Sequence, residues 1–86
     1  SAQVKNSLIS DGCEIEGTVE NCILFRGVKV GKGSVVKNSI IMQDTVIGTG
    51  VQLDCVITDK NVVIRDRRHL AGCEELPYFI AKGRML

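Results

Sequence analysis

The 86-residue sequence has no tryptophan, few other aromatic residues, a single proline and no long apolar run. Aromatic residues make up 3% of the chain, whereas the apolar share is 44% and is carried by valine, isoleucine and leucine. A core of aliphatic residues favours β-strands over disorder. Because no stretch of about 18 apolar residues occurs, no transmembrane helix is expected.

The sequence also lacks a large net charge of either sign, since its formal charge is only +1. Such a balance creates no field that would attract nucleic acid or an anionic membrane, so neither is expected as a partner. No signal peptide is recognised, and a cytoplasmic location is expected. Residues 1–2 are interpreted as a cloning remnant and are left out of the fold prediction.

A four-residue pattern, [Asn/Asp]-[Ser/Cys]-aliphatic-aliphatic, occurs four times, and its copies begin 15, 17 and 16 residues apart. A second pattern, aliphatic-small-x-Gly, recurs between these copies. The first pattern occupies 6–9, 21–24, 38–41 and 54–57, and the second occupies 30–33, 47–50 and 80–83, with a shortened relative at 15–17. Such regular repetition indicates a stack of similar structural units.

The aliphatic residues recur in steps of about six rather than at the 3.6-residue period of a helix. Glycines within these repeats would each cost about 1 kcal/mol in a helix interior. A six-residue step with sharp corners is typical of a parallel β-helix, in which three hexads form one triangular coil. We therefore predict an all-β, single-domain parallel β-helix of three to four coils over residues 3–64. Its left-handed sense rests on similarity to hexapeptide-repeat proteins, because parallel crossovers are otherwise right-handed.

Asn6, Asn21 and Asn38 are expected at one corner, because asparagine tolerates the left-handed backbone region and can bond to its own chain. Cys22 and Cys55 are expected to replace Ser7 and Ser39 as small packing residues in a reduced protein. No C-x-x-C motif occurs, so zinc is not expected. The predicted interior residues are Val4, Leu8, Ile15, Val19, Val30, Val36, Ile40, Ile47, Val51, Leu53, Ile57 and Ile64.

Residues 65–79 contain clustered charge and the only histidine, proline and tyrosine. This segment is predicted to be an irregular charged excursion from the coil, followed by a returning terminal strand at 80–86. A short solenoid leaves open ends and sheet edges that must be capped or paired. Association through a sheet face or an open end is therefore expected.

The sequence offers little for catalysis. The glycines at 27–34 lack the spacing of a phosphate-binding loop, and His69 would be a poor general base beside several arginines. No catalytic residue, cofactor-binding residue or metal ligand is expected. Arg65, Arg67, Arg68 and His69 form a basic cluster, which is either a solvated loop balanced by nearby acidic residues or an anion site, because arginine can bind phosphate bidentately.

The stretch GTVENCILFRGVKVGKGSVVKNSIIMQDTVIG at 17–48 closely resembles the C-terminal β-helix domain of bacterial glucose-1-phosphate adenylyltransferase (ADP-glucose pyrophosphorylase). VITDKNVVI at 56–64 and EELPYFIAKG at 74–83 extend the resemblance. The tail resembles the regulatory-type subunit, the glycogen biosynthesis protein, more than the catalytic subunit. The resemblance implies an N-terminal nucleotidyltransferase domain, missing from this chain, which uses Mg²⁺ with ATP and glucose 1-phosphate to make ADP-glucose and pyrophosphate.

The resemblance further implies that the β-helix domain joins homo- or hetero-oligomers with other adenylyltransferase subunits and takes part in allosteric regulation. Arg65, Arg67 and Arg68 are similar in placement to arginines that bind a phosphorylated sugar effector in some members. Whether the parent subunit is itself an enzyme is left open. The alternative is a stand-alone hexapeptide-repeat acyltransferase using acetyl-CoA, which the lack of a histidine within the repeats and of a long protruding loop disfavours.

Overall fold

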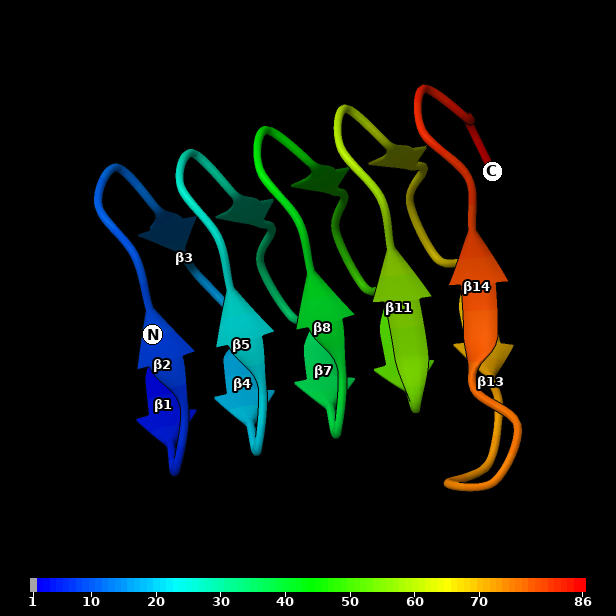
Figure 1. The fold of residues 1–86 in the computed structure, drawn as a ribbon. Coiled ribbons are helices and arrows are strands. Elements are labelled where there is room, and N and C mark those ends of the chain that lie inside the picture. Colours follow the sequence, from blue (N-terminus) through cyan, green and yellow to red (C-terminus); the bar gives the residue numbers. More distant parts are fainter. Residues whose placement is uncertain (1) are drawn as a thin grey trace.

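Residues 2–86 are described by a computed structural model, in which 14 short β-strands build three parallel sheets (Figure 1). Ser1, part of the predicted cloning remnant, lies outside the described residues. Each strand pairs with strands one coil before and after it. Between residues 2 and 86 no helix is long and apolar enough to cross a membrane.

The sheets form the three sides of a prism, and the strands of each sheet follow one another in space along the coil axis. Sheet A contains β1 (Gln3–Lys5), β4 (Thr18–Glu20), β7 (Val35–Lys37), β10 (Gln52–Asp54) and β13 (His69–Ala71). Sheet B contains β14 (Tyr78–Ile80), β11 (Val56–Thr58), β8 (Ile40–Ile41), β5 (Ile23–Leu24) and β2 (Leu8–Ile9). Sheet C contains β12 (Val63–Ile64), β9 (Val46–Ile47), β6 (Lys29–Val30) and β3 (Glu14–Ile15).

The chain forms four complete coils and part of a fifth, which consists of β13, β14 and a bridge between Val63 and Met85. In Figure 1 the chain rises along the near strands of sheet B, crosses over the top to sheet C behind, and advances toward the C-terminal end. This sense is left-handed. The predicted all-β, left-handed parallel β-helix is therefore confirmed, with slightly more coils than expected.

The first corner, which we call the asparagine corner, joins sheet A to sheet B. Its residues Asn6, Asn21, Asn38 and Cys55 all have positive φ, between 48° and 56°. The asparagine side chains form a ladder along the coil axis, in which Asn21 Nδ2 donates to Asn38 Oδ1 at 3.2 Å and Asn38 Nδ2 donates to Asp54 Oδ1 at 3.0 Å. The predicted asparagine corner is confirmed. Asparagine suits it because this residue tolerates a positive φ and its side chain hydrogen-bonds to the corner of the next coil.

The second corner joins sheet B to sheet C and is called the lysine corner, because Lys60 and Lys82 lie there beside its turn residues. The third corner joins sheet C to sheet A and is called the arginine corner. Both corners also turn through residues with positive φ. The turn residues are Gly12, Gly27, Asp44, Asn61 and Gly83 at the lysine corner, and Gly33, Gly50 and Arg67 at the arginine corner.

The predicted alignment of the fourth repeat was wrong by one residue. Ile57 pairs with Ile40, so Cys55 takes the place of Asn38 and not that of Ser39. The physical reason is the length of the coil, since Val35 pairs with Gln52 and the later coils therefore contain 17 residues. Cys22 does replace serine as predicted. Its Sγ donates a hydrogen bond to the carbonyl oxygen two residues earlier, at 3.2 Å, and the Oγ of Ser39 donates in the same way, at 2.7 Å.

The interior is filled by stacked aliphatic residues, and no buried side-chain oxygen or nitrogen among residues 2–86 lacks a hydrogen bond. The core comprises Val19, Cys22, Leu24, Val28, Val30, Val36, Ile41, Ile47, Val51, Leu53, Val56, Val62, Ile64 and Ile80. Most of the predicted interior residues belong to it, and Ile15 packs against it. Val4 is in register with Val19 but is 46% exposed, because no coil precedes it in the structure.

Three predicted interior residues, Leu8, Ile40 and Ile57, instead point outward from sheet B. Successive side chains of a strand point to opposite faces, so two adjacent aliphatics cannot both enter the core. The second one does so, as the complete burial of Leu24 and Ile41 shows. The three outward residues therefore belong to the outer surface of sheet B.

The predicted excursion at 65–79 is narrower in the structure. The charged residues 65–68 form an ordinary arginine corner, and β13 then pairs with β10 in register. Charged side chains can point outward at a corner without interrupting the coil. The cluster of charged residues therefore did not mark the end of the β-helix. The irregular part is confined to residues 72–77, which lie between β13 and β14 at the asparagine corner.

Candidate functional site: an apolar sheet face and an arginine corner

The outer surface of sheet B carries one large apolar side chain in every coil. These side chains are in register from strand to strand, so they form a continuous column along the coil axis. The column consists of Leu8, Ile23, Ile40, Ile57 and Phe79. Leu8 is 70% exposed, Phe79 56% and Ile23 40%, whereas Ile40 and Ile57 are half-buried between their neighbours.

Phe25 and Met42 extend this column toward the lysine corner. Each follows its sheet B strand directly, and the backbone N–H of Phe25 donates to the carbonyl oxygen of Ile41 at 2.9 Å, so both residues continue the parallel ladder. Phe25 is 41% exposed. The column and these two residues together are called the apolar face.

Sheet A presents mainly polar side chains to solvent. Its outward residues Lys5, Glu20, Lys37 and Asp54 are in register and alternate in charge. On sheet C the outward position is mixed, with Glu14 and Lys29 in the first two coils and Val46 and Val63 in the next two. Since sheet A forms the same coils with a largely polar outer face, the apolar face is not a requirement of the fold. A contiguous exposed apolar patch of this kind marks an interaction site.

The sequence contains a signal for this face, which the predicted set of interior residues does not include. Every repeat carries two adjacent aliphatic residues, and only one can point inward. The other one was therefore available from the pattern as a row of exposed apolar residues.

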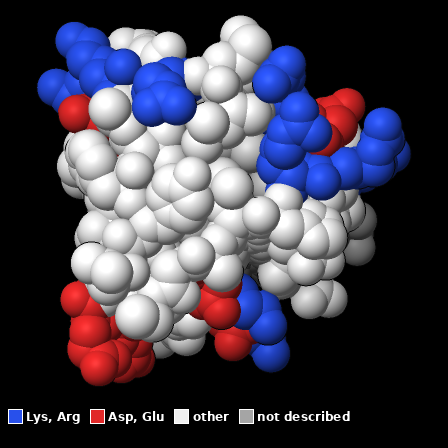
Figure 2. Space-filling view, turned by 90° about the vertical axis from the view of Figure 1, so that its right-hand side faces the viewer, with Lys and Arg blue, Asp and Glu red and all other residues white. Residues whose placement is uncertain are grey.

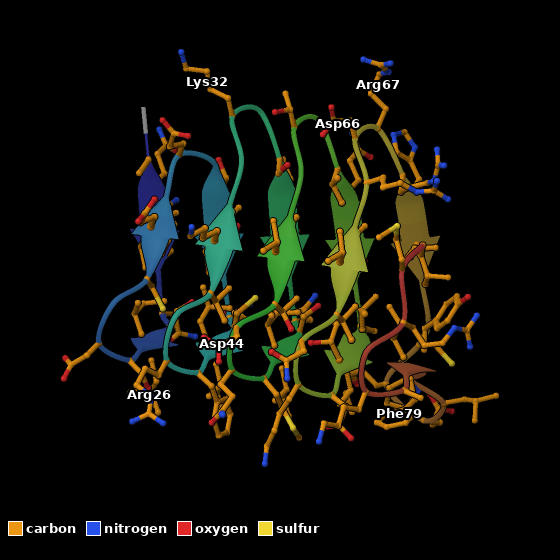
Figure 3. The ribbon with its side chains drawn as sticks, turned by 90° about the horizontal axis from the view of Figure 1, so that it is seen from above. Arg26, Lys32, Asp44, Asp66, Arg67 and Phe79 are labelled. Carbon is orange, nitrogen blue, oxygen red and sulfur yellow. The ribbon has the colours of Figure 1, made fainter. Side chains whose placement is uncertain are left out.

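The predicted basic cluster lies at the arginine corner of the fourth coil. Figure 3 shows Lys32, Asp66 and Arg67 projecting from this edge, while Arg26 and Asp44 project from the lysine corner on the opposite side of sheet C. Arg67 has a φ of 59°, at the position that glycine occupies in the two preceding coils.

The structure places Arg65 and Arg68 in one hollow, whereas Arg67 does not line it and the histidine lies in another hollow. Arg65 and Arg68 line a shallow hollow of about 420 Å³ beside sheet C, together with Asp66. His69 begins β13 and lines a different hollow, of about 460 Å³, on the outer surface of sheet A with Lys37 and Asp54.

Asp66 is held against the corner and so partly balances the arginines. Its Oδ1 accepts a hydrogen bond from the backbone N–H of Thr49 at 2.9 Å. Arg65 is also engaged, because its Nε donates to the carbonyl oxygen of Leu86 at 3.4 Å. Among residues 2–86, the guanidinium groups of Arg67 and Arg68 have no hydrogen-bond or ion-pair partner, so they can receive an anion.

The four cysteines are free thiols, and two have perturbed acidity. Burial raises the pKa of the Cys22 thiol, and hydrogen bonding by backbone groups of Ser39 and Glu20 only partly opposes it. Desolvation, followed by the neighbouring Asp54 carboxylate, raises the pKa of Cys55. Both thiols are therefore neutral near pH 7 and are poor nucleophiles.

Within residues 2–86, no three His, Cys, Asp or Glu side chains come close enough together to hold a metal ion. These residues therefore do not fit the Mg²⁺ that the resemblance implies for the longer adenylyltransferases.

Parallel coils built from six-residue steps, with asparagine and glycine at their corners, define a hexapeptide-repeat β-helix. Its distinguishing surfaces are an apolar sheet face and a basic corner. The chain belongs to the family described as GlmU-like, C-terminal hexapeptide, whose model matches residues 1–75.

Similar bacterial proteins include a glycogen biosynthesis protein and glucose-1-phosphate adenylyltransferases. The chain is 55% identical over 80 residues to the glycogen biosynthesis protein GlgD of Bacillus subtilis, and the aligned residues cover 93% of this chain and 23% of that protein. It is 41% identical over 75 residues to the glucose-1-phosphate adenylyltransferase of Desulforamulus reducens, covering 87% of this chain and 18% of that protein.

The glucose-1-phosphate adenylyltransferase of Fervidobacterium nodosum is 42% identical over 74 residues, covering 86% of this chain and 17% of that protein. The chain thus spans about a fifth of the length of the curated relatives it matches. These relatives agree with the predicted resemblance and do not favour the acyltransferase alternative.

Proposed function

We propose that this chain is the assembly domain of a longer, cytoplasmic glycogen-biosynthesis subunit of the adenylyltransferase type. In this role it binds other subunits of the same type and takes no part in the chemistry. The parent reaction would be the formation of ADP-glucose and pyrophosphate from ATP and glucose 1-phosphate, carried out by a domain outside this chain.

The apolar face is the observation that supports this proposal. Its residues expose large apolar side chains on a chain of only 9.4 kDa, and burying apolar surface contributes roughly 25 cal/mol per Å². A β-helix also presents a regular, rigid surface, because each strand is fixed by its neighbours in the coils before and after it. Such a surface suits a permanent contact between subunits.

The test introduces charge into the face within the full-length subunit. Ile23→Lys combined with Ile40→Lys is expected to shift sedimentation of the subunit, alone and mixed with its adenylyltransferase partner, toward smaller species. Gln52→Lys, on the outer surface of sheet A, is the matched control and leaves assembly unchanged. Far-ultraviolet dichroism verifies that each variant is folded. An unchanged oligomer in the doubly substituted subunit would refute the proposal.

For the arginine corner, we propose a second role as the binding site for a phosphorylated sugar effector of the assembled protein. At this corner Arg67 projects outward (Figure 3), and Arg65 and Arg68 line the hollow beside sheet C. Among residues 2–86, the guanidinium groups of Arg67 and Arg68 have no hydrogen-bond or ion-pair partner. Guanidinium groups bind phosphate oxygens bidentately. His69, which belongs to the predicted cluster, lies on the outer surface of sheet A in β13, so it is left out of this proposed site.

Calorimetry of the full-length subunit with a hexose bisphosphate tests this role. Replacing the three arginines by alanine is expected to weaken binding at least tenfold, because each lost charge-assisted hydrogen bond contributes about 1.5–3 kcal/mol. Lys5→Ala on sheet A is the control. Equal affinity in the triple variant and in the unmodified subunit would mean that the corner is only a solvated surface.

A further inference from the structure

The fifth coil contains a short insertion at the asparagine corner. Its Gly72 stacks on Cys55 of the fourth coil, because the backbone N–H of Gly72 donates to the carbonyl oxygen of the residue before Cys55 at 2.9 Å. Tyr78 stacks on Val56, the next residue of the fourth coil, and its N–H donates to the carbonyl oxygen of Cys55 at 3.0 Å. Residues 73–77 are therefore inserted between two positions that are consecutive in the fourth coil.

The insertion folds into a tight hairpin that holds Cys73 at its base. The backbone N–H of Cys73 donates to the carbonyl oxygen of Leu76 at 3.2 Å, and the N–H of Leu76 donates back to Cys73 at 3.0 Å. In Figure 1 this loop, drawn in orange between β13 and β14, extends below the corners of the other coils and bends back toward β11. Glu74 and Glu75 at its tip are exposed, and Figure 2 shows acidic side chains gathered at this corner, at the lower left.

The base of the hairpin brings Cys73 close to Cys55. Neighbouring strands of a sheet lie about 4.8 Å apart, and consecutive Cα atoms lie about 3.8 Å apart. Cys73 is one residue beyond Gly72, which stacks on Cys55. With these two steps roughly at right angles, the Cα atoms of the two cysteines are about 6 Å apart. Disulfide bonds join cysteines whose Cα atoms are about 4.4–6.8 Å apart.

The electrostatic surroundings of Cys55 are a second indication of this proximity. Desolvation is the main cause that raises the pKa of its thiol, the Asp54 carboxylate is the next, and smaller contributions come from Glu74 and from the Cys73 thiol. Glu74 and Cys73 both belong to the hairpin, so the hairpin lies over the Cys55 side chain. Cys55 is accordingly half-buried, whereas Cys73 is exposed to solvent.

The other two cysteines are held in different places. Cys22 is buried, and its Sγ donates to the carbonyl oxygens of Glu20 at 3.2 Å and Val36 at 3.3 Å. Cys13 follows the turn of the lysine corner, and its Sγ donates to the carbonyl oxygen of Phe25 at 3.1 Å. Cys55 and Cys73 are therefore the two thiols that share one corner in adjacent coils.

From this geometry, we propose that Cys55 and Cys73 form a reversible oxidation site, at which a peroxide converts the two thiols into an intrachain disulfide between the fourth and fifth coils. The site is independent of the apolar face and of the arginine corner. In a reducing compartment both thiols are free at rest, and disulfides that form there are usually transient and redox-sensing.

The exposed Cys73 reacts first, because solvent reaches it directly. Its thiolate attacks one oxygen of hydrogen peroxide, the O–O bond breaks, and Cys73 becomes a sulfenic acid while the other oxygen leaves as hydroxide and is protonated to water. The sulfur of Cys55 then attacks the sulfur of Cys73. The S–O bond breaks, the S–S bond forms, and the hydroxyl group leaves as water with the proton of Cys55. The thiols thus lose two electrons in total, and the peroxide is reduced to two waters.

The second step is intramolecular, so a neutral Cys55 thiol can complete it. The disulfide closes a loop over residues 55–73 and ties the fifth coil to the fourth. Because the last unit of a solenoid has a neighbour on one side only, it is the part that opens most readily. Oxidation therefore stabilises the C-terminal end, including β14, which follows the hairpin directly.

Treatment of the folded 86-residue chain with hydrogen peroxide, followed by mass spectrometry, tests the proposal. The expected product is a single chain that is lighter by two hydrogen atoms and that dithiothreitol returns to four free thiols. Trypsin cleaves after lysine and arginine, so it releases Cys55 in the peptide 38–60 and Cys73 in the peptide 69–82, and neither peptide contains another cysteine. A disulfide-linked pair of these peptides identifies the bond.

Two further measurements report its structural effect. Closing a loop of this length is expected to raise Tm by roughly 10 °C. Hydrogen exchange of the Tyr78 amide, which donates to the carbonyl oxygen of Cys55, is expected to slow on oxidation.

Cys55→Asn is the most informative variant, because it places at this corner the residue that the first three coils carry there with positive φ. This substitution keeps the fold and is expected to abolish both the linked peptides and the rise in Tm. Cys73→Ser, in the hairpin, is expected to do the same. Cys13→Ser is the matched control and leaves both results unchanged.

Three results would overturn the proposal. One is the absence of the linked peptides after peroxide treatment, including a product in which Cys73 is oxidised to a sulfinic acid instead. Another is a rise in Tm that persists in Cys55→Asn. The third is a linkage that forms only in urea, where chain proximity and not the stacked coils brings thiols together.

Discussion

The adjacent residues Ile40 and Ile41 provide a sharp test of the coil geometry, because the same side chain faces opposite environments one position apart. Ile41 is fully buried and lies in register between Leu24 and Thr58. Ile40 points outward and is half-buried in the apolar face. Replacing each by alanine removes the same atoms, so the difference in stability reports the direction of the side chain alone.

The expected losses follow from burial. Alanine at position 41 forfeits about 0.8 kcal/mol for each buried methylene and leaves a cavity that the stacked coils cannot close, so we expect a loss of about 3–4 kcal/mol. Alanine at position 40 forfeits about half of the transfer free energy and leaves no cavity, so we expect about 1 kcal/mol.

Urea unfolding followed by far-ultraviolet dichroism measures both losses. The experiment is done at low protein concentration, because association through the face would add stability that depends on concentration. Ile23→Ala and Leu24→Ala repeat the comparison one coil earlier, where the two residues are 40% and 0% exposed. Equal losses at 40 and 41, or a larger loss at 40, would refute the alternation on which the apolar face depends.

Three further predictions concern corners and thiols. A Cβ on Gly31 would overlap the carbonyl oxygen of Gly48, so Gly31→Ala is expected to lower the free energy of unfolding by at least about 2 kcal/mol. Gly33 has open space around it but a φ of 73°, so Gly33→Ala is expected to lower it by about 1–2 kcal/mol. Calorimetry that shows no loss of stability in either variant would contradict this. Asn38→Ala is expected to lower stability by about 1–2 kcal/mol, with Asn38→Gly recovering part of the loss because glycine tolerates the positive φ; equal loss in both would exclude a backbone cause. Because the pKa of Cys22 is raised in the folded state, its stabilising contribution is complete below its ordinary pKa of 9.0 and is lost as pH rises beyond that value. Cys22→Ser is therefore expected to flatten the fall in Tm between pH 8 and 10, and an identical pH profile in the variant would speak against the assigned cause.

Much of the fold could be predicted from the sequence, because a corner imposes strict chemistry. Asn6, Asn21 and Asn38 recur where the chain turns with positive φ, and few residues accept that conformation. The six-residue step then predicts strands between the corners. Both features are local, so a single sequence reveals them.

The direction of the side chains was harder to predict, because a pair of adjacent aliphatic residues does not itself show which of the two points inward. The corner fixes it: after Asn38 the small Ser39 turns inward, Ile40 outward and Ile41 inward. The fourth repeat was misaligned because Asp54 resembles the asparagines in chemistry, while the positive φ belongs to Cys55. Only the register between coils distinguishes them.

The candidate site was predicted in part. The basic residues were recognised from their clustering, but the corner divides them, since a turn sends Arg68 and His69 toward different hollows. The apolar face was not recognised, because three of its residues, Leu8, Ile40 and Ile57, were assigned to the core. Exposed and buried aliphatics have the same composition, so the position of each residue relative to the preceding corner is needed to separate them.

Amide chemical shifts recorded over a dilution series of the 86-residue chain test most directly whether sheet B is the contact surface. Residues of β2, β5, β8, β11 and β14 are expected to shift with protein concentration, while sheet A and the first coil's open end at Val4 stay constant. Shifts confined to sheet A or to the open end, or no shift at any concentration, would contradict this account.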